Sequence, residues 1–267
     1  MGITRVRPGA SVKLHRIDPR GTGGLKEDEA KRKLEKDLDE LADLHDCVYA
    51  AGNHAVLIVL QGMDTSGKDG TVKHVMRALN PVGCNVVPFK VPTEEEAAHD
   101  FLWRIHRAVP RHRQVTIFNR SHYEDVIVPF VHRTLPHRVI EERYERINEF
   151  ERLLVDSHTL VLKFFLHISK HEQHERLVER LKDPTKRWKF SAGDWKEREL
   201  WPRYMRAYEH LLRRCSTRSA PWWVVPADHK WYRNFAVAST LIDALRGLHC
   251  RYPEPPIPPA LRRRVGL

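Results

Sequence analysis

The sequence has few cysteines and no long apolar run, and both features narrow the class of protein. Its four cysteines show no CxxC spacing, which disfavours a zinc site and suits unpaired thiols in a reducing compartment. No apolar stretch approaches the roughly 18 residues of a membrane span. The start, MGITRVRPGASVKL, has no secretory hydrophobic region. We therefore expect a cytoplasmic protein with no membrane partner.

Acidic residues are outnumbered by basic ones. The chain of 267 residues has 46 Lys and Arg against 35 Asp and Glu, a formal net charge of +11. Such an excess favours a polyanionic partner, although net charge alone fits a merely basic surface equally well. The placement of the basic residues has to decide between these two interpretations.

Apolar, β-rich runs alternate with helical patterns along the chain. Helices are expected at about 26–50, 68–79, 93–108 and 136–157, after Ser169, and after the last strand. Strands are expected in HAVLIVLQ (54–61), CNVVPF (84–89), QVTIFN (114–119), LVLKFFLHI (160–168) and WWVVP (222–226). The alternation predicts an α/β protein with a parallel five-stranded sheet and helices on both faces.

The two ends of the chain differ from this pattern. Residues 1–24, with two prolines and the sequence GTGG, predict an irregular N-terminal arm. Residues 253–267 are proline-rich and predict an extended tail. One domain is expected between them, over residues 25–252.

Residues 62–70 resemble a phosphate-binding loop between a strand and a helix. Gly62 and Gly67 flank four residues before Lys68, as the glycine-lysine part of that motif requires. Glycines let backbone N–H groups turn toward phosphate oxygens, the helix N-terminus adds partial positive charge, and Lys68 adds a full charge. The expected phosphate-binding residues are Gly62, Met63, Thr65, Ser66, Gly67, Asp69 and Gly70.

Asp69 stands where such loops usually carry a Ser or Thr that helps to hold magnesium. Asp64 and Asp69 are hard oxygen ligands close to the expected phosphate, and Mg²⁺ usually takes one or two carboxylates. Asp64 lies midway round the loop, and we expect it to bind Mg²⁺. For Asp69, a favourable contact with the helix dipole is an equally good explanation.

The polar cluster NRSHYED (119–125) ends the third predicted strand, where ligands bind in open α/β sheets. Asn119 replaces the magnesium-binding acid common at this place in phosphate-loop enzymes. Glu124 or Asp125 is expected to take over the metal contact. Arg120 is expected to grip phosphate oxygens and to stabilise charge in the transition state. A solvated charged loop is the alternative.

The segment KDPTKRWKFSAGD, residues 182–194, is rich in basic residues and helix breakers. Arg176 and Arg180 precede it on one face of a predicted helix. Such a segment could close on phosphates as the lid of a nucleotide kinase does, and ordinary solvated surface is the alternative. The basic residues of this predicted lid are Lys182, Lys186, Arg187 and Lys189.

Together these motifs resemble the family-two polyphosphate kinases, which move a terminal phosphate between inorganic polyphosphate and nucleotides. The resemblance covers most of residues 10–255. It implies a thymidylate-kinase-like phosphate-loop fold, Mg²⁺, and polyphosphate lying in a basic channel. It rests on GMDTSGKDGTVKHV (62–75), FKVPTEEE (89–96), FNRSHYEDV (118–126), KFFLHIS (163–169), KRWKF (186–190) and APWWVVPADHKWYRN (220–234).

The resemblance also implies residue roles. Catalytic roles fall on Asp64, Lys68, Arg120 and Glu124, and metal binding on Asp64, Asp69 and Glu124. Further phosphate- or nucleotide-binding residues are Lys90, Asn119, Arg180, Lys186 and Arg187. Asn followed by RSHYED is similar to the subgroup that phosphorylates both nucleoside mono- and diphosphates. The implied partners are polyphosphate, AMP, ADP and ATP, with guanine nucleotides left open, in a homo-oligomer that needs no nucleic acid.

The expected reaction is reversible, magnesium-dependent phosphoryl transfer by direct in-line attack, which needs alignment and charge neutralisation but no protein nucleophile. Two alternatives stay open. An ATP-dependent nucleotide kinase would use the same sheet, loop and lid, but Asp69 and the basic excess argue against it. A non-catalytic polyanion or nucleic-acid binder would leave Asp64 and Glu124 unexplained.

Overall fold

The structure is a computed structural model that describes residues 2–266. Its sheet has six strands in the order β1-β6-β5-β2-β4-β3. The strands are β1 (Thr4–Arg5), β2 (Ala55–Gln61), β3 (Cys84–Pro88), β4 (Val115–Asn119), β5 (Thr159–His167) and β6 (Trp222–Pro226). Strands β2 to β6 pair in parallel, as the alternation of strands and helices predicted. The predicted number of five is wrong, because β1 adds an antiparallel edge beside β6.

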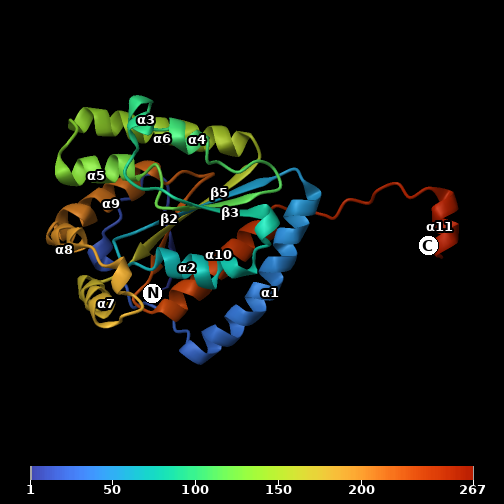
Figure 1. Cartoon of the computed structure of the whole chain (residues 1–267), viewed down its shortest axis with the longest axis horizontal. Helices are drawn as coiled ribbons and strands as arrows, with labels where there is room; N and C mark the ends of the chain where they lie inside the picture. Colours follow the sequence, from blue (N-terminus) through green and yellow to red (C-terminus); the bar gives the residue numbers. More distant parts are fainter. Residues whose placement is uncertain (1, 267) are drawn as a thin grey trace.

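Helices cover both faces of the sheet, as predicted (Figure 1). One face carries α1 (Glu27–Ala51), α2 (Lys68–His74) and α10 (Lys230–Arg246). The other carries α5 (Glu124–His132), α6 (His137–Asp156) and α9 (Trp201–Cys215), with α3 (Glu94–Ala98) and α4 (Trp103–His106) near α6. Helices α7 (Lys170–Lys182) and α8 (Ala192–Glu199) lie close together at one end of the molecule.

The central strand β2 explains how the sheet positions the loops. All seven of its residues are buried, which is why its sequence is almost continuously apolar. Leu60 pairs in register with Asn119 on one side and with Phe164 on the other. The carboxyl ends of β2 and β4 therefore lie next to each other, and the loops that follow them leave the sheet side by side.

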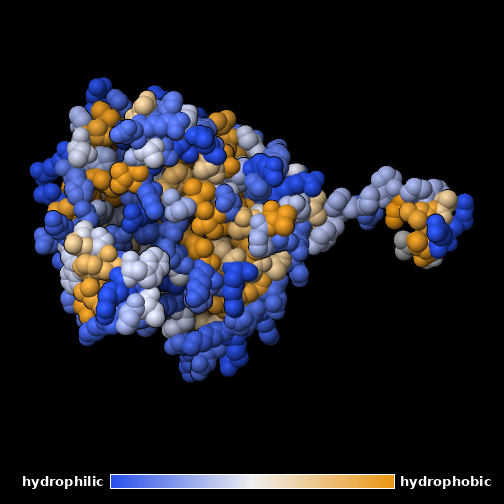
Figure 2. All heavy atoms as spheres, in the orientation of Figure 1, coloured by the Kyte–Doolittle hydropathy of each residue, from blue (hydrophilic) through white to orange (hydrophobic). Residues whose placement is uncertain are grey.

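Several elements differ from the predicted pattern. The helix expected over 93–108 is broken: α3 has the expected capping box of Thr93 and Glu96 but ends at Ala98. The Asp100 carboxylate then accepts from the Leu102 backbone N–H, which opens a separate turn before α4. In the tail, residues 259–265 form a short helix, α11 (Pro259–Val265), instead of an extended segment. Figures 1 and 2 show this tail projecting away from the body.

Helix α5 is absent from the sequence-based prediction because it starts inside a polar cluster and contains a proline. Pro129 has no N–H to donate to the carbonyl of Asp125 four residues earlier. The Arg143 guanidinium of α6 donates to that carbonyl instead, at 2.7 Å. A contact between helices therefore replaces the missing bond within the helix.

A fully buried ion pair anchors the polar cluster to the core. Lys163 in the middle of β5 donates to Glu151 of α6 at 2.5 Å, to the Cys215 carbonyl at 2.6 Å and to the Tyr123 hydroxyl at 3.1 Å. The Tyr123 hydroxyl donates to the other Glu151 oxygen at 2.6 Å. Burial alone would raise the pKa of Glu151, but Lys163 and His122 outweigh it and hold that pKa below its usual value. The carboxylate therefore stays ionised in the core.

The described residues, 2–266, include no helix that is both long enough and apolar enough to span a bilayer.

Replacing Lys163 by methionine should destabilise the fold strongly, because the buried Glu151 carboxylate would lose the cation that compensates its charge. Breaking such a pair on one side costs about 3–5 kcal/mol, which urea denaturation would measure. The double variant Lys163→Met/Glu151→Leu should be more stable than the single variant. The control Arg138→Met removes an exposed ion pair with Glu142 and should change stability by less than about 0.5 kcal/mol. Equal losses for Lys163→Met and Arg138→Met would contradict this account.

Candidate active site

The loop between β2 and α2 has the backbone that its glycines predict. Gly67, with φ of 104°, and Gly62, with φ of 151°, adopt conformations that disfavour other residues. A β-carbon on Gly62 would also lie 2.7 Å from the Leu166 carbonyl oxygen. On Gly67 it would overlap with the guanidinium of the buried Arg233. Both glycines are therefore needed for conformation and for space.

Two side chains of α7 hold this loop from outside. Arg176 donates to the Thr65 carbonyl at 2.9 Å and to the Ala227 carbonyl after β6 at 2.7 Å. Gln173 donates to the Asp64 carbonyl at 3.2 Å. The sequence places Arg176 on the same helix face as Arg180. Because Arg176 is only 7% exposed, its main role is to fix the loop to the edge of the sheet.

Lys68 lies buried at the start of α2 with its ammonium inside the loop. Its Nζ donates to the Gly62 carbonyl at 2.8 Å and to the Met63 carbonyl at 3.2 Å. Burial, followed by the charge of Arg120, lowers the pKa of Lys68 to about 8. A bound phosphate would compensate for both effects, since it brings negative charge into the loop.

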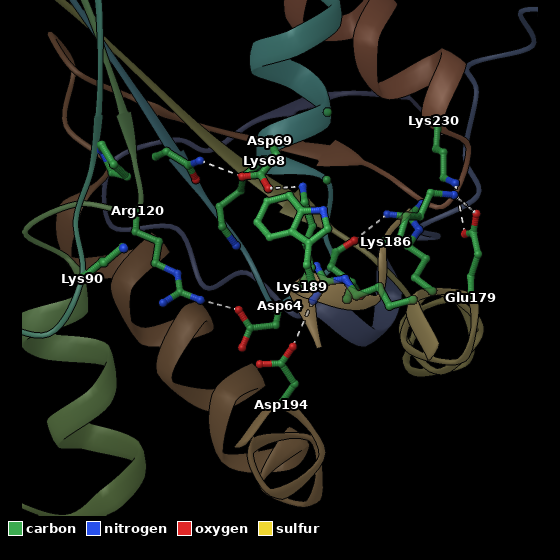
Figure 3. A pocket seen from close by; sticks show the side chains of 18 of the residues that line it. Asp64, Lys68, Asp69, Lys90, Arg120, Glu179, Lys186, Lys189, Asp194 and Lys230 are labelled. Carbon is green, nitrogen blue, oxygen red and sulfur yellow. Dashed lines mark hydrogen bonds and ion pairs between the residues drawn. The ribbon is translucent and has the colours of Figure 1, made fainter. Parts of the chain in front are cut away.

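Arg120 leaves the end of β4 and points at the loop (Figure 3). Its backbone has a positive φ of 63°, and its N–H donates to the Leu60 carbonyl of β2 at 3.1 Å. Its guanidinium forms a short ion pair with Asp64. Burial lowers the pKa of Arg120, but the charges of Asp64 and Glu124 outweigh burial and raise it. The side chain is 41% exposed, so it stays accessible from the cleft.

Glu124 begins α5 and lies beside the same charges without lining the cleft itself. Burial raises its pKa against the opposing charges of Arg120 and Lys68. The amide of Gln61 lies between Ser121 and Glu124; with its nitrogen toward Glu124, it donates to that carboxylate at 3.0 Å. Glu124 therefore lies close to the catalytic candidates, and its charge favours the charged forms of Arg120 and Lys68.

Asp69 in the first turn of α2 links three parts of the site. Its carboxylate accepts from Asn119 at the end of β4, at 2.8 Å, and from Lys189 of the predicted lid, at 3.1 Å. Burial would raise the pKa of Asp69, but these two hydrogen bonds outweigh it and lower that pKa. A favourable contact with the helix dipole therefore does not by itself explain why an acid stands at this position. Through Asp69 the lid segment is joined to the phosphate loop.

Residues of the two loops and of the predicted lid segment line a cleft of about 530 Å³. Most of the predicted site residues line it: Asp64, Thr65, Gly67, Lys68, Asp69, Gly70, Lys90, Asn119, Arg120, Arg180 and Lys186. Five predicted residues do not line it: Gly62, Met63, Ser66, Glu124 and Arg187. Arg187 is exposed and donates to the Leu181 carbonyl at 3.2 Å, so the structure does not bring its side chain to the cleft.

Eight cationic side chains and four carboxylates line this cleft. Between α7 and the predicted lid some of them are paired: Arg180 with Asp194 at 3.0 Å, and Lys186 with Glu179 at 2.6 Å (Figure 3). Lys230 of α10 lies 3.7 Å from Glu179. Because the cations outnumber the acids, the cleft can hold several phosphate groups, whose oxygens would compete with these carboxylates for the same donors.

Some residues of the cleft are not among the predicted binding residues. Lys189 and Trp188 belong to the predicted lid without a predicted binding role, and both line the cleft. Lys230 follows the last strand, within the stretch APWWVVPADHKWYRN. Asp194 ends the predicted lid segment, whereas Glu179 lies before it. No role was predicted for either carboxylate, because their part in the site depends on how α7 and α8 pack. Burial and the charge of Asp64 raise the pKa of Asp194.

Asp64 and Asp69 both present carboxylates to the cleft, beside the loop that would hold phosphate. Oxygen donors of this kind, few in number and next to phosphate, are what Mg²⁺ uses in phosphoryl-transfer sites. The residues present therefore fit such an ion.

Known proteins are similar to this chain over most of its length. The family model of Polyphosphate kinase 2 (PPK2) matches residues 24–252. The AMP/ADP-polyphosphate phosphotransferase of Meiothermus ruber is 50% identical over 94% of this chain and 95% of its own length. The ADP-polyphosphate phosphotransferase of Rhodopseudomonas palustris is 39% identical over 87% of this chain and 84% of its own length.

A solved structure shows the same fold. The crystal structure of Polyphosphate Kinase 2 from Arthrobacter aurescens TC1 superimposes with a TM-score of 0.93 at 42% sequence identity, covering 98% of this chain and 94% of the other. The phosphate-loop kinase fold implied by the resemblance is thereby confirmed. The chain belongs to the polyphosphate kinase 2 family.

Proposed function

We propose that this protein transfers phosphoryl groups between inorganic polyphosphate and nucleotides, with AMP and ADP as acceptors. The observation that carries the proposal is the cleft in which the phosphate loop, Arg120 and the lid cations converge. Support for both acceptors comes from the relative in Meiothermus ruber, whose name includes AMP and ADP, at 50% identity over nearly the whole chain. Asn119 before RSHYED points to the same dual-acceptor subgroup.

In this proposal Lys68 and Arg120 hold the oxygens of the transferring phosphoryl group. Charge spreads over those oxygens in the transition state, and fixed cations stabilise it without reorganising. Arg180, Lys186, Lys189 and Lys230 would hold the remaining phosphates of the chain, with Lys90 on the opposite wall. No protein nucleophile is needed, because the acceptor oxygen can attack the bound phosphoryl group in line.

Kinases of this family generally use a divalent metal, and we propose Mg²⁺. Asp64 and Asp69 would bind it directly, with Glu124 close behind them. When bound, the ion would neutralise phosphate charge. ATP would be the product from ADP. The homo-oligomer and the cytoplasmic location stay predictions.

The test is product formation by purified protein with polyphosphate as the sole phosphoryl donor, offering AMP and ADP in separate reactions. We expect ATP from ADP and ADP from AMP, followed by chromatography. Transfer from ATP alone, with none from polyphosphate, would favour the nucleotide-kinase alternative. Tight RNA binding without any transfer would favour the polyanion binder.

Replacing Asp64 by asparagine should reduce the rate on the order of 10²- to 10³-fold while leaving the fold intact. The amide keeps the shape but neither balances Arg120 nor binds Mg²⁺ as a carboxylate does. Steady-state rates over a magnesium titration would measure the loss. Asp156→Asn, an exposed acid at the end of α6, is the matched control and should be active. A near-normal rate for Asp64→Asn would remove Asp64 from the mechanism.

Neutralising two lid cations, Lys186→Gln and Lys189→Gln, should weaken polyphosphate binding about tenfold or more and flatten its dependence on salt. Charged contacts with a polyanion weaken as ions screen them, so fewer contacts give a shallower slope. Michaelis constants at several salt concentrations would show this. Lys182→Gln serves as control, since Lys182 is exposed and does not line the cleft. Equal effects of all three changes would assign the lid charges to ordinary surface.

The pH dependence should report Lys68. Its pKa is lowered to about 8 by burial, so the free enzyme loses this charge as pH rises through about 8. We expect kcat/KM to fall above that pH by up to about tenfold per pH unit, because kcat/KM follows the free enzyme. Lys68→Arg, which stays charged, should keep a lower but flat profile. A wild-type profile flat to about pH 9.5, as for an ordinary lysine, would contradict this role.

A further inference from the structure

A cluster of metal-ligating side chains lies between α6 and α9, outside the proposed active site. His137 and Glu141 are one turn apart on α6, and His210 faces them from α9. One ligand atom from each of the three lies within 4.8 Å of the others. None of them lines the cleft, so this cluster is separate from the acids proposed to bind Mg²⁺.

The two oxygens of Glu141 have different partners. One, Oε1, faces both imidazoles, with His210 Nε2 at 2.5 Å and His137 Nε2 at 3.7 Å. The other, Oε2, forms an ion pair with Arg214 of α9, whose Nε lies 3.0 Å away without donating a hydrogen bond. The charge of Arg214 thus holds Oε2 on its side and leaves Oε1 toward the two rings. An outer partner of this kind is what orients the carboxylate ligands of metal sites.

We propose that His137, Glu141 and His210 bind a divalent transition-metal ion of the Zn²⁺ type, which would bridge α6 and α9. Two imidazoles and one carboxylate, with a fourth position open to water, are a ligand set that Zn²⁺ uses in proteins. Nitrogen ligands favour such ions over Mg²⁺, which prefers oxygen. Because the ligands are His and Glu, the absence of paired cysteines does not exclude this site.

The surroundings allow an ion to enter and to replace the present contacts. The His137 side chain is 67% exposed, whereas His210 is 17% and Glu141 27% exposed, so the site opens to solvent on the His137 side. Binding at His210 Nε2 requires that nitrogen to be unprotonated, so the proton shared with Glu141 leaves Nε2 and one proton is taken up from solvent at Nδ1. The Nδ1 atom then carries the ring proton and can no longer accept a hydrogen bond. The exposed Arg213, whose guanidinium lies 3.4 Å from Nδ1, therefore turns away.

The bridge would act on the helices that support the active site. Helix α9 follows α8, which begins at the end of the predicted lid segment, and packs against α5, whose first residue is Glu124. An ion that binds the folded chain through two helices, and the unfolded chain less tightly, stabilises the folded state. Micromolar Zn²⁺ is therefore expected to raise the melting temperature of the protein.

The experiment is calorimetric titration of ZnCl₂ into the full chain without an affinity tag, in the absence of nucleotide and polyphosphate. One strong equivalent is expected, unaffected by excess Mg²⁺. His137→Asn and Glu141→Gln should each weaken that binding at least tenfold. The visible absorption of Co²⁺ bound in place of Zn²⁺ would report a site with few ligands and would be lost in both variants. Circular dichroism without metal checks that both variants fold.

The matched control is His171→Asn on α7. His171 is as exposed as His137 and pairs with Glu175 at the same spacing, with their ligand atoms 3.3 Å apart. Among residues 2–266, however, these two side chains are not part of any group of three metal-ligating residues. This variant should bind Zn²⁺ like the wild type. The proposal is overturned if no strong equivalent is seen, if His137→Asn and His171→Asn weaken it equally, or if Mg²⁺ displaces the ion, which would place it in the cleft.

Discussion

The site depends on the parallel register of β2 and β4. Because Leu60 pairs with Asn119, the phosphate loop and the Arg120 loop leave the sheet edge side by side. A hydrogen bond from the Arg120 N–H to the Leu60 carbonyl continues that pairing by one residue and turns the guanidinium toward Asp64. Open α/β sheets bind ligands at the carboxyl ends of their strands for this geometric reason. A shift in register would separate Lys68 from Arg120.

Two sets of charges depend on this frame, one in the core and one in the cleft. The buried pair of Lys163 and Glu151 holds Tyr123, and thereby the segment that carries Arg120 and Glu124, against β5. In the cleft, cations outnumber carboxylates, and carboxylates hold several of the cations, among them Arg120, Arg180 and Lys186, in place. When a phosphate chain takes the place of these carboxylates, the cationic side chains of the protein are already positioned to bind it. Phosphoryl transfer requires positive charge that is preorganised in this way.

The sequence is most informative where local chemistry decides the structure. The buried parallel strands, the glycine loop around Lys68 and the cap at Thr93 follow from residue type and spacing, and they form as predicted. Strand β1 was not predictable because two residues carry no periodicity. Helix α5 depends on a hydrogen bond from Arg143 of α6, and such a contact between helices is not visible in the sequence. Of the predicted lid cations, Lys186 and Lys189 reach the cleft and Arg187 does not. This difference depends on how one turn of the segment packs against α7, which the sequence does not show.

The central claim is that the two loops transfer a phosphoryl group directly between bound substrates. The most direct test is rapid-quench analysis of the protein mixed with ³²P-labelled polyphosphate and Mg²⁺, with and without ADP. The account predicts that label appears in ATP within one turnover when ADP is present, and that none stays on the denatured protein when ADP is absent. Label covalently bound to the protein, or none transferred to ADP, would contradict it.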